Sequence, residues 1–441
     1  MAEQETRDRA SFLIKTHGCK VNQYESQLIR EQLVQAGFNE CVAGEQPSLC
    51  IVNTCTVTEQ SDAKSRQSLR KFIRKHPKAL IVAVGCYVEA EDEMLKEIDG
   101  VDLLINNAGK VDFIAGITPL IRCRNSFRPP TSISRFAGHT RAFIKVQNGC
   151  NNYCSYCKVP YVRGRSKSRD IIEILSEARA VAINGFREIV VTGIHLGDFG
   201  KSADISRHRL PELLEGLAAI EEVQRVRLSS IDPDEVTDEL ISAITGCPKV
   251  CHHLHISIQS GSDRVLERMN RRYSRQVCLD LARRLYQLIP DISISTDVMV
   301  GFPGETEEDF GNSVKLIEQI GFSKVHIFSF SPRPGTAAVS MPDHVASKTI
   351  KDRAVRIQEA ASRAALRHRQ KFIGSIQQIL VERFEPVEKK ALGLTDNYLR
   401  CEVNCPRIED NGLEKQVIST KIQNVDTKLL YGERICEKKA L

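Results

Sequence analysis

The sequence predicts an α/β protein of three parts: an N-terminal parallel sheet covered by helices, a partial (β/α) barrel of six units, and a small C-terminal β-barrel. Strand-like runs alternate with helical patterns over residues 11–120, and six further strand-like runs follow over residues 142–330. Such alternation is typical of parallel sheets covered by helices. After a final long helical pattern, only short strand-like runs remain. We therefore expect domains at residues 10–121, 136–367 and 370–436.

The composition is that of an ordinary globular protein. Of the 441 residues, 41% are hydrophobic and 27% are charged. The polar first residues lack the apolar stretch of a signal peptide, and apolar runs such as 80–84 are too short to span a membrane. We expect a cytoplasmic protein without a membrane partner. In such a reducing compartment, 15 cysteines favour metal or redox chemistry over disulfides.

The N-terminal part contains four strand-like runs, each followed by a helical pattern. We predict strands at 11–15, 48–53, 79–84 and 101–105, and helices at about 23–36, 60–75, 89–98 and 109–118. In a parallel sheet the carboxyl ends of the strands share an edge, where ligands bind. Two prolines and several polar residues at 122–132 indicate a linker to the second part.

The central part contains six strand-like runs separated by helical segments. They lie at 142–147, 188–192, 225–229, 254–259, 292–300 and 324–330. This arrangement predicts a partial (β/α)6 barrel, whose active site is expected at the carboxyl ends of its strands. A helical pattern at about 347–371 follows, and the remaining strands are expected at 376–382, 397–403 and 417–420.

Cys150, Cys154 and Cys157 form the pattern C-x3-C-x2-C directly after the first barrel strand. Four protein ligands close a structural metal site, whereas three thiolates on a four-iron cluster leave one iron open for a substrate or cofactor. The structural alternative is a zinc site completed by a distant ligand such as His253. The expected position at the barrel mouth favours catalysis.

A second set of cysteines follows the first three N-terminal strands. Cys19, Cys55 and Cys86 are far apart in sequence, but a parallel sheet would bring them to one edge. The simple alternative is three unrelated core residues, because free cysteine is often buried.

The sequence around both sets of cysteines resembles the methylthiotransferases of the radical S-adenosylmethionine superfamily. The matching segments are T-H-G-C-K-V-N-Q-Y-E-S-Q, N-T-C-T-V-T-E-Q, V-G-C-Y, N-R-R-Y at 270–273, S-P-R-P-G-T at 331–336, and a TRAM-like end that includes G-L-T-D-N-Y-L-R. The resemblance covers almost the whole chain. It implies a [4Fe–4S] cluster at Cys150, Cys154 and Cys157 that cleaves S-adenosylmethionine to a radical. It also implies an auxiliary [4Fe–4S] cluster, held by the other three cysteines, where one S-adenosylmethionine methylates a sulfur and a second supplies the radical.

The superfamily also implies that the barrel strand ends contact S-adenosylmethionine. The expected residues are Tyr156, Thr192, Gly193, Ser257, Gln259, Asp297 and Gly301. The segment T-G-I-H-L-G-D at 192–198 departs from the common form G-G-E, which leaves the contact at the second strand open. Gly301 and Gly304 are expected to let the backbone approach the cofactor.

Basic residues suggest a nucleic-acid partner. We predict RNA contacts from Arg163 and Arg165 on the loop after the cysteine motif, and from Arg353, Arg356, Arg363 and Arg367 on one face of the long helix. The plain alternative is that both are solvated charged surfaces. The resemblance implies a tRNA anticodon stem-loop as partner, with a reduced flavodoxin- or ferredoxin-type electron donor and a sulfur donor.

Three substrates are possible for the family that the chain resembles. The segment G-C-K-V-N-Q-Y-E-S is most similar to bacterial enzymes that place a methylthio group on carbon 2 of N6-threonylcarbamoyladenosine at tRNA position 37. The alternatives within the family are isopentenylated adenosine and an aspartate of a ribosomal protein. A non-enzymatic zinc and RNA-binding module is the alternative from another class. Spacing and composition do not choose among these substrates.

Overall fold

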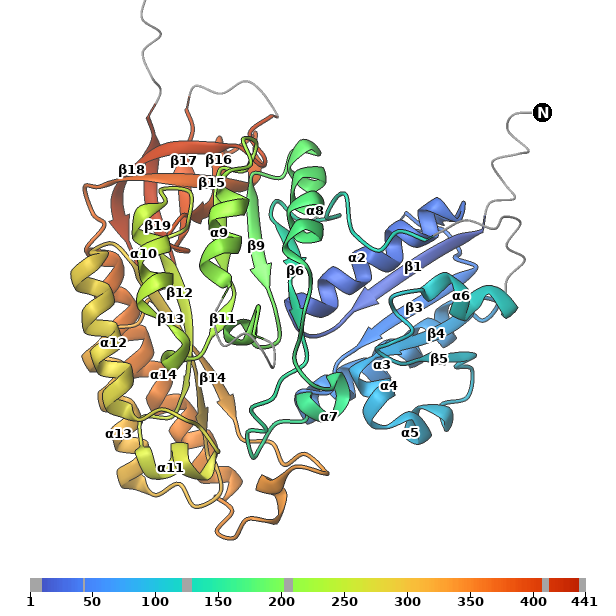
Figure 1. Ribbon diagram of the computed structural model, residues 1–441, viewed down its shortest axis with the longest axis horizontal. Helices are drawn as coiled ribbons and strands as arrows, with labels where there is room; N and C mark the ends of the chain where they lie inside the picture. Colours follow the sequence, from blue (N-terminus) through green and yellow to red (C-terminus); the bar gives the residue numbers. More distant parts are fainter. Residues whose placement is uncertain (1–9, 43, 121–128, 202–208, 407–411, 436–441) are drawn as a thin grey trace, which may run out of the picture.

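The computed structural model describes residues 10–42, 44–120, 129–201, 209–406 and 412–435. It confirms the predicted α/β class, with an N-terminal sheet, a central partial barrel and a closed C-terminal barrel (Figure 1). Most of the expected linker at 122–132 lies outside the described residues. No helix in the described part of the chain is long and apolar enough to cross a membrane.

The N-terminal domain is a five-stranded sheet of order β2-β1-β3-β4-β5, and all neighbouring strands are parallel. Its strands are β1 (Ser11–Thr16), β2 (Asn39–Glu40), β3 (Leu49–Thr54), β4 (Leu80–Gly85) and β5 (Leu103–Ile105). Its helices are α2 (Lys20–Gln35), α3 (Glu59–Lys75), α4 (Cys86–Ala90), α5 (Asp92–Lys96), α6 (Phe113–Ile117) and the short η1 (Thr118–Leu120). The helix predicted at 89–98 is two short helices, and the one predicted at 109–118 begins at Phe113. Every side chain of β3 is buried, because separate apolar clusters cover the two faces of the sheet.

The central domain contains the six predicted strands, and the third is interrupted at Ser229. Its strands are β6 (Ala142–Lys145), β9 (Glu188–Thr192), β10 (Arg225–Leu228) with β11 (Ser230–Ile231), β12 (His253–Gln259), β13 (Ser293–Val300) and β14 (Lys324–Ser329). The break divides the barrel into two sheets, of order β10-β9-β6 and β11-β12-β13-β14. All pairs within these sheets are parallel.

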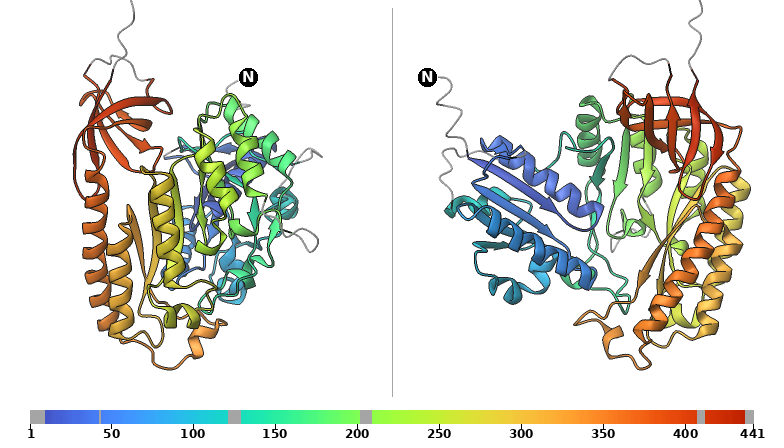
Figure 2. Two further views of the ribbon diagram at one scale, coloured as in Figure 1. Left: turned by 60° about the vertical axis from the view of Figure 1, so that its left-hand side comes forward. Right: turned by 180° about the vertical axis from the view of Figure 1, so that it is seen from behind.

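Helices cover the outside of the partial barrel (Figure 2). They are α8 (Ile171–Ile183), α9 (Leu210–Ala218), α10 (Asp238–Gly246), α11 (Asp263–Arg268), α12 (Arg275–Leu288), α13 (Glu307–Ile320) and α14 (Ser347–Gln370). Smaller elements lie at the strand ends: β7 (Gln147–Asn148), α7 (Val159–Arg163), β8 (Lys167–Ser168), η2 (Leu196–Asp198), η3 (Pro233–Glu235) and η4 (Ala337–Ser340). One apolar cluster joins the covering helices to the strands.

The C-terminal domain is a closed barrel of order β15-β16-β17-β19-β18. Its strands are β15 (Ile376–Glu385), β16 (Lys390–Thr395), β17 (Arg400–Asn404), β18 (Val417–Val425) and β19 (Leu430–Arg434). The sequence did not predict β16 or β19, each of which contains a glycine. A Cβ at Gly393 would lie 2.2 Å from the Leu380 carbonyl oxygen, and one at Gly432 would lie 2.7 Å from that of Lys421. The close approach of neighbouring strands therefore requires glycine at these two positions, and glycine weakens the sequence pattern by which a strand is predicted.

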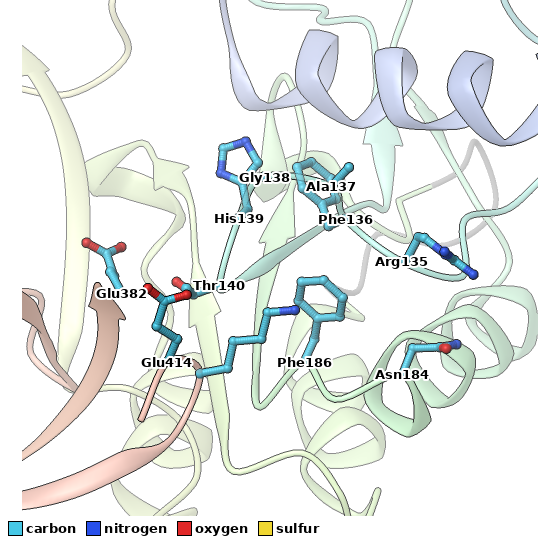
Figure 3. Close-up of a pocket in the computed structure, with 11 residues that line it drawn as sticks. Arg135, Phe136, Ala137, Gly138, His139, Thr140, Asn184, Phe186, Glu382 and Glu414 are labelled. Atoms are coloured by element: carbon cyan, nitrogen blue, oxygen red, sulfur yellow. The ribbon is translucent and has the colours of Figure 1, made fainter. Parts of the chain in front are cut away.

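The C-terminal barrel packs against the amino ends of the central strands, opposite the expected active site (Figure 1). Arg225 donates to the Leu394 carbonyl over 3.0 Å, and Arg227 donates to that of Asp396 over 2.6 Å. A pocket of about 530 Å³ lies between the central domain and the C-terminal barrel, and it is lined by residues 135–140 before β6, by the turn before β9 and by the C-terminal domain (Figure 3).

Buried ion pairs dock the N-terminal domain onto the central domain. Glu25 of α2 pairs with Lys110 over 2.8 Å, with Lys145 of β6 over 3.2 Å and with Arg163 of α7 over 3.0 Å. On the other side of the interface, Arg333 donates to Asp62 over 2.5 Å.

We predict that Glu25→Gln lowers the free energy of unfolding by about 3–5 kcal/mol, because it leaves buried cations without their carboxylate. Glu40→Gln is the matched control and should cost less than about 1 kcal/mol, since Glu40 pairs with Arg30 near the surface. Denaturant titration of both variants measures the difference. Equal losses would contradict a special role for the buried pairs.

The loss should also depend on pH. Burial alone would raise the pKa of Glu25, but Lys110, Arg163 and Lys145 outweigh it and hold the pKa well below the usual value of 4.5. A depressed folded pKa adds stability above pH 4.5 that disappears as the pH falls through the folded pKa. The gap between wild type and Glu25→Gln should therefore narrow below pH 4.5.

Candidate active site

The carboxyl edge of the N-terminal sheet brings Cys19, Cys55 and Cys86 together. Cys19 is the N-cap residue of α2, Cys55 directly follows β3, and Cys86 begins α4 directly after β4. The pKa of the Cys55 thiol is raised to about 11 by burial and by the nearby thiols of Cys19 and Cys86. The three thiols therefore lie within electrostatic reach of one another.

Two glycines make room for this edge. Gly18 has φ +92°, and a Cβ there would lie 2.7 Å from the Cys55 sulfur. Gly85 has φ +106°, and a Cβ there would lie 2.8 Å from the Thr54 carbonyl oxygen. Each glycine directly precedes a cysteine, so backbone freedom at Gly18 and Gly85 sets the direction of Cys19 and Cys86.

Cys150, Cys154 and Cys157 lie on the loop between β7 and α7, at the carboxyl end of the central strands. The Cys150 amide donates to the Gly164 carbonyl over 3.1 Å, which fixes the start of the loop against the end of α7. Burial and the neighbouring thiolates of Cys154 and Cys150 raise the pKa of the Cys157 thiol to about 12.

The segment N-R-R-Y at 270–273 holds the cysteine loop through hydrogen bonds. Asn270 donates to the carbonyls of Asn152 and Tyr153, each over 3.1 Å. Arg271 donates to the Cys154 sulfur over 3.2 Å and also to Asp232 over 2.5 Å. A guanidinium beside a thiolate stabilises the negative charge of the thiolate.

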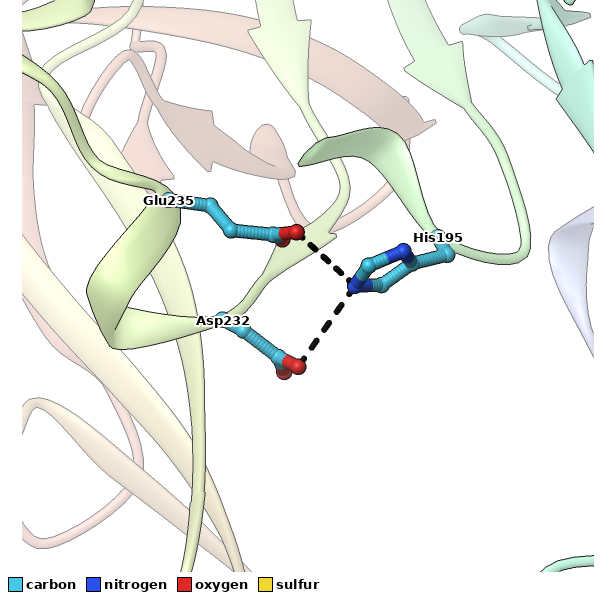
Figure 4. Close-up of side chains that lie close together, drawn as sticks. All are labelled: His195, Asp232 and Glu235. Atoms are coloured by element: carbon cyan, nitrogen blue, oxygen red, sulfur yellow. Dashed lines mark ion pairs between the residues drawn. The ribbon is translucent and has the colours of Figure 1, made fainter. Parts of the chain in front are cut away.

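His195 points toward the carboxylates of Asp232 and Glu235 (Figure 4). His195 Nε2 is 3.0 Å from Glu235 and 3.6 Å from Asp232, and its Nδ1 is 3.1 Å from Asp198. Burial alone would lower the pKa of His195, but the three carboxylates outweigh it and raise the pKa to about 12. His195, Asp232 and Glu235 also form a group compact enough to hold a metal ion.

A pocket lies between the N-terminal and central domains, beside Cys157. This pocket of about 180 Å³ is lined by Val57 and Thr58, which follow Cys55, and by Tyr156 and Cys157 of the other set. Met299 and Phe328 form its apolar wall on β13 and β14. Atoms bound in this pocket would lie beside Cys157 and beside the segment that follows Cys55.

The structure brings some of the predicted cofactor residues to this pocket. Tyr156, Gln259 and Asp297 line it, and Gln259 has a strained φ of +66° at a bulge of β12. Ser257 lies below it, where its carbonyl accepts from Tyr273 over 2.5 Å. The buried hydroxyl of Thr192 donates to the Val190 carbonyl, over 3.1 Å, within its own strand.

Three predicted glycines pack against protein atoms. A Cβ at Gly193 would lie 2.8 Å from Leu196, and one at Gly301 would lie 2.4 Å from Ile350. A Cβ at Gly304 would lie 2.9 Å from the guanidinium of Arg268. These glycines make room for neighbouring side chains, and the expected approach of the cofactor to the backbone at Gly301 and Gly304 stays a prediction.

The predicted RNA-binding arginines divide into buried and exposed groups. Arg163 pairs with Glu25, and Arg353 pairs with Glu305 over 2.8 Å with almost no exposed side chain. A buried guanidinium that is paired with a carboxylate cannot reach a phosphate on the protein surface. Arg163 and Arg353 therefore join elements of the protein to one another and do not make the expected RNA contact. The exposed residues of the set are Arg165, Arg356, Arg363 and Arg367.

The sequence analysis assigned no role to several residues of the site. N-R-R-Y contributed to the family resemblance, but the contact between Arg271 and Cys154 required the fold. Asp232 and Glu235 stand at the end of the interrupted third strand, where no motif marked them.

Comparisons with known proteins agree with this geometry. Residues 144–317 match the radical SAM superfamily, and residues 11–106 match the uncharacterized protein family UPF0004. The chain is 37% identical to threonylcarbamoyladenosine tRNA methylthiotransferase MtaB of Chlamydia pneumoniae, over 93% of this chain and 99% of that one. It belongs to the tRNA methylthiotransferase family of radical SAM enzymes.

Other members are nearly as similar to this methylthiotransferase. MtaB of Bacillus subtilis is 35% identical over 89% of this chain and 90% of its own. A tRNA-2-methylthio-N(6)-dimethylallyladenosine synthase of Acetivibrio thermocellus is 33% identical over 86% and 82%. Among solved structures, the radical S-adenosylmethionine methyltransferase TsrM of Kitasatospora setae matches with a TM-score of 0.56, at 17% identity over 75% of this chain and 77% of that one, which supports the fold.

The cofactors of this enzyme are [4Fe–4S] clusters and S-adenosylmethionine, and the thiols fit such clusters. Among the described residues, the ligand groups compact enough for a single ion are His195–Asp232–Glu235 and His252–Asp291–Asp396, and neither includes a cysteine. Each cysteine set is therefore spread more widely than the ligands of one zinc ion. The buried thiols have raised pKa values, and the positive charge of bound iron would favour their thiolates.

We predict that replacing Cys150, Cys154 and Cys157 by alanine leaves about four irons per chain, the content of one cubane, in place of about eight. S-adenosylmethionine cleavage should be lost, because the remaining cluster lies on the other domain. Iron analysis and 5′-deoxyadenosine detection measure the two effects. The matched triple variant at Cys19, Cys55 and Cys86 should retain cleavage, and the opposite pattern would reverse the assignment.

Proposed function

We propose that the protein transfers a methylthio group to carbon 2 of N6-threonylcarbamoyladenosine at position 37 of tRNA. The observation that carries the proposal is a pair of three-cysteine sites on two domains, with a pocket between the domains that is lined by Cys157 and by two residues that follow Cys55. The choice of substrate rests on the relatives at 35–37% identity, whose names specify threonylcarbamoyladenosine. Relatives at 30–33% identity that are named for dimethylallyladenosine support the alternative substrate.

Bound clusters and S-adenosylmethionine would supply radical chemistry and the methylthio group. The residues of the chain would hold the reactants and exclude water. Tyr156, Met299 and Phe328 surround the pocket with apolar surface, which limits side reactions of a radical with solvent. Arg271 would stabilise the Cys154 thiolate, and buried Arg163 and Arg333 would keep the two domains in register.

An RNA loop would approach beside the cysteine motif. Tyr153 and Tyr161 are 45% and 60% exposed and form an edge-to-face pair with centroids 5.9 Å apart. Exposed Arg165 and Lys167 line an adjoining cleft of about 430 Å³ and have no ion pair among the described residues. Exposed aromatic rings beside free cations suit unstacked bases and phosphates. We further propose the anticodon stem-loop as the bound element, with a flavodoxin- or ferredoxin-type electron donor and a separate sulfur donor.

We expect a strain that lacks the gene to lose 2-methylthio-N6-threonylcarbamoyladenosine from its tRNA and to accumulate the unthiolated nucleoside. Mass spectrometry of digested tRNA measures both species, and expression of the wild-type chain should restore the product. Loss of the dimethylallyl product alone would transfer the assignment to the alternative substrate. Unchanged content of both products would refute a tRNA substrate.

The double variant Arg165→Ala/Lys167→Ala should weaken tRNA binding and reduce the slope of log K against log salt by about 1.4 to 1.8, because two phosphate contacts are lost. Filter binding at several salt concentrations gives this slope. The matched control is Arg363→Ala/Arg367→Ala on α14, which removes the same charge from a surface that lies away from the pocket. A reduced slope for the control pair alone would place the RNA on the long helix.

A further inference from the structure

The outer side of α3, together with the turn that follows it, forms a strongly basic surface. No aspartate or glutamate occurs between Asp62 and Glu89, whereas this stretch contains seven lysines and arginines. One of them, Arg66, donates to the hydroxyl of Tyr87 over 2.5 Å. The other six are exposed, and they make up what we call the α3 basic face: Lys64, Arg70, Lys71, Arg74, Lys75 and Lys78.

The α3 basic face points away from the protein. The opposite side of the helix contains the buried Ser65 and Leu69, and Leu69 packs into the apolar cluster that covers one face of the N-terminal sheet. Lys64 and Lys71 are seven residues apart and therefore lie on nearly the same side of the helix, away from Leu69. Among the described residues, no carboxylate forms an ion pair with any member of this face.

Helix stability does not account for the α3 basic face. Arg74 and Lys75 lie in the last turn, where cations interact favourably with the helix dipole. Lys64, Arg70 and Lys71 lie earlier in the helix and gain no such benefit. Like charges four residues apart repel each other, as those of Arg70 and Arg74 do. A bound polyanion would offset this repulsion, whereas the helix alone does not.

Exposed arginines on another long helix are neutralised by neighbouring acids. On α14, Arg356 pairs with Glu307 over 2.5 Å, and Arg363 pairs with Glu318 over 2.9 Å. The outer side of α3 instead presents charge of a single sign over several helical turns. Such a surface attracts polyanions over longer distances than a surface of mixed charge does.

The helix begins beside the pocket between the two domains. Thr58, the N-cap residue of α3, lines this pocket, and the Glu59 amide donates to the Ser331 hydroxyl of the central domain over 3.4 Å. With a rise of 1.5 Å per residue, Lys64 lies about 9 Å along the helix axis from Thr58, and Lys75 lies about 26 Å from it. An RNA with one nucleotide in the pocket would therefore have its adjoining stem within reach of α3.

The chemistry of the α3 basic face favours a nucleic acid over a protein. Protein interfaces combine an apolar core with a polar rim. No large apolar side chain of α3 is exposed, although every residue of this helix is described. Phosphate groups, in contrast, are bound by cations alone, and these contacts position the nucleic acid without reading its sequence.

We propose that the α3 basic face binds the phosphate backbone of the tRNA stem that adjoins the modified loop. This inference rests on the proposed function and adds a second docking surface to it. The surface is separate from the cleft lined by Arg165 and Lys167, which contains no residue of α3. The N-terminal domain would then hold both the auxiliary cysteines and part of the RNA.

The salt dependence of binding tests the inference. The probe is a synthetic anticodon stem-loop with N6-threonylcarbamoyladenosine at position 37, and the protein is the full chain with its clusters. Lys64→Gln/Arg70→Gln/Lys71→Gln should bind more weakly and should reduce the slope of log K against log salt by about 2.1 to 2.7, because three phosphate contacts are lost. Glutamine has nearly the helix propensity of lysine and arginine, so α3 should be retained.

The matched control is Arg356→Gln/Arg363→Gln/Arg367→Gln, which removes three charges from the exposed side of α14. It should keep the wild-type slope. Iron content and melting temperature verify that both variants are folded. A wild-type slope for the folded α3 variant, or an equal reduction in both variants, would overturn the inference.

A footprint on the wild-type protein tests the same surface without any substitution. Lysines are acetylated with and without the stem-loop and are then quantified by mass spectrometry. Lys64 and Lys71 should be protected by the RNA, whereas the exposed Lys348 of α14 should not. Equal acetylation of Lys64 and Lys71 in both samples would overturn the inference. Protection by a flavodoxin but not by the RNA would also overturn it and would assign the face to an acidic protein.

The failure of this inference is distinguishable from failure of the proposed function. Unprotected α3 lysines, in a chain whose deletion removes 2-methylthio-N6-threonylcarbamoyladenosine from tRNA, would overturn the α3 surface alone. Protected lysines together with unchanged tRNA nucleosides in the deletion strain would support the RNA surface and overturn the proposed reaction.

Discussion

The buried contact between Glu25 and Arg163 is the constraint on which the active site depends. Arg163 ends the helix that follows Cys157, and Glu25 lies on the helix that follows Cys19. Each partner is thus covalently close to one cysteine set. Because a buried charge is costly without its partner, the pair stabilises one relative position of the two domains strongly. Arg333 and Asp62 add a second buried contact on the other side, which restricts rotation about the first.

The cysteines and the C-terminal barrel lie at opposite ends of the central strands. Arg225 and Arg227 bind carbonyl groups of the C-terminal barrel at the amino ends of the strands, and the cysteines occupy the carboxyl ends. An RNA that used both ends would have to span the height of the central domain. A stem-loop has the elongated shape for such a contact, whereas a single nucleotide does not.

The sequence predicted the fold and the positions of the cysteines after strands because both follow local patterns. Strand and helix periodicity placed the carboxyl edges, and Cys55 and Cys86 each directly follow a strand. The same local patterns do not show which side chains pair across long sequence separations. Arg163 resembled an RNA ligand in a basic loop, but its partner Glu25 is 138 residues away. Gly301 resembled a cofactor contact, but the space beside it is filled by Ile350 of a later helix.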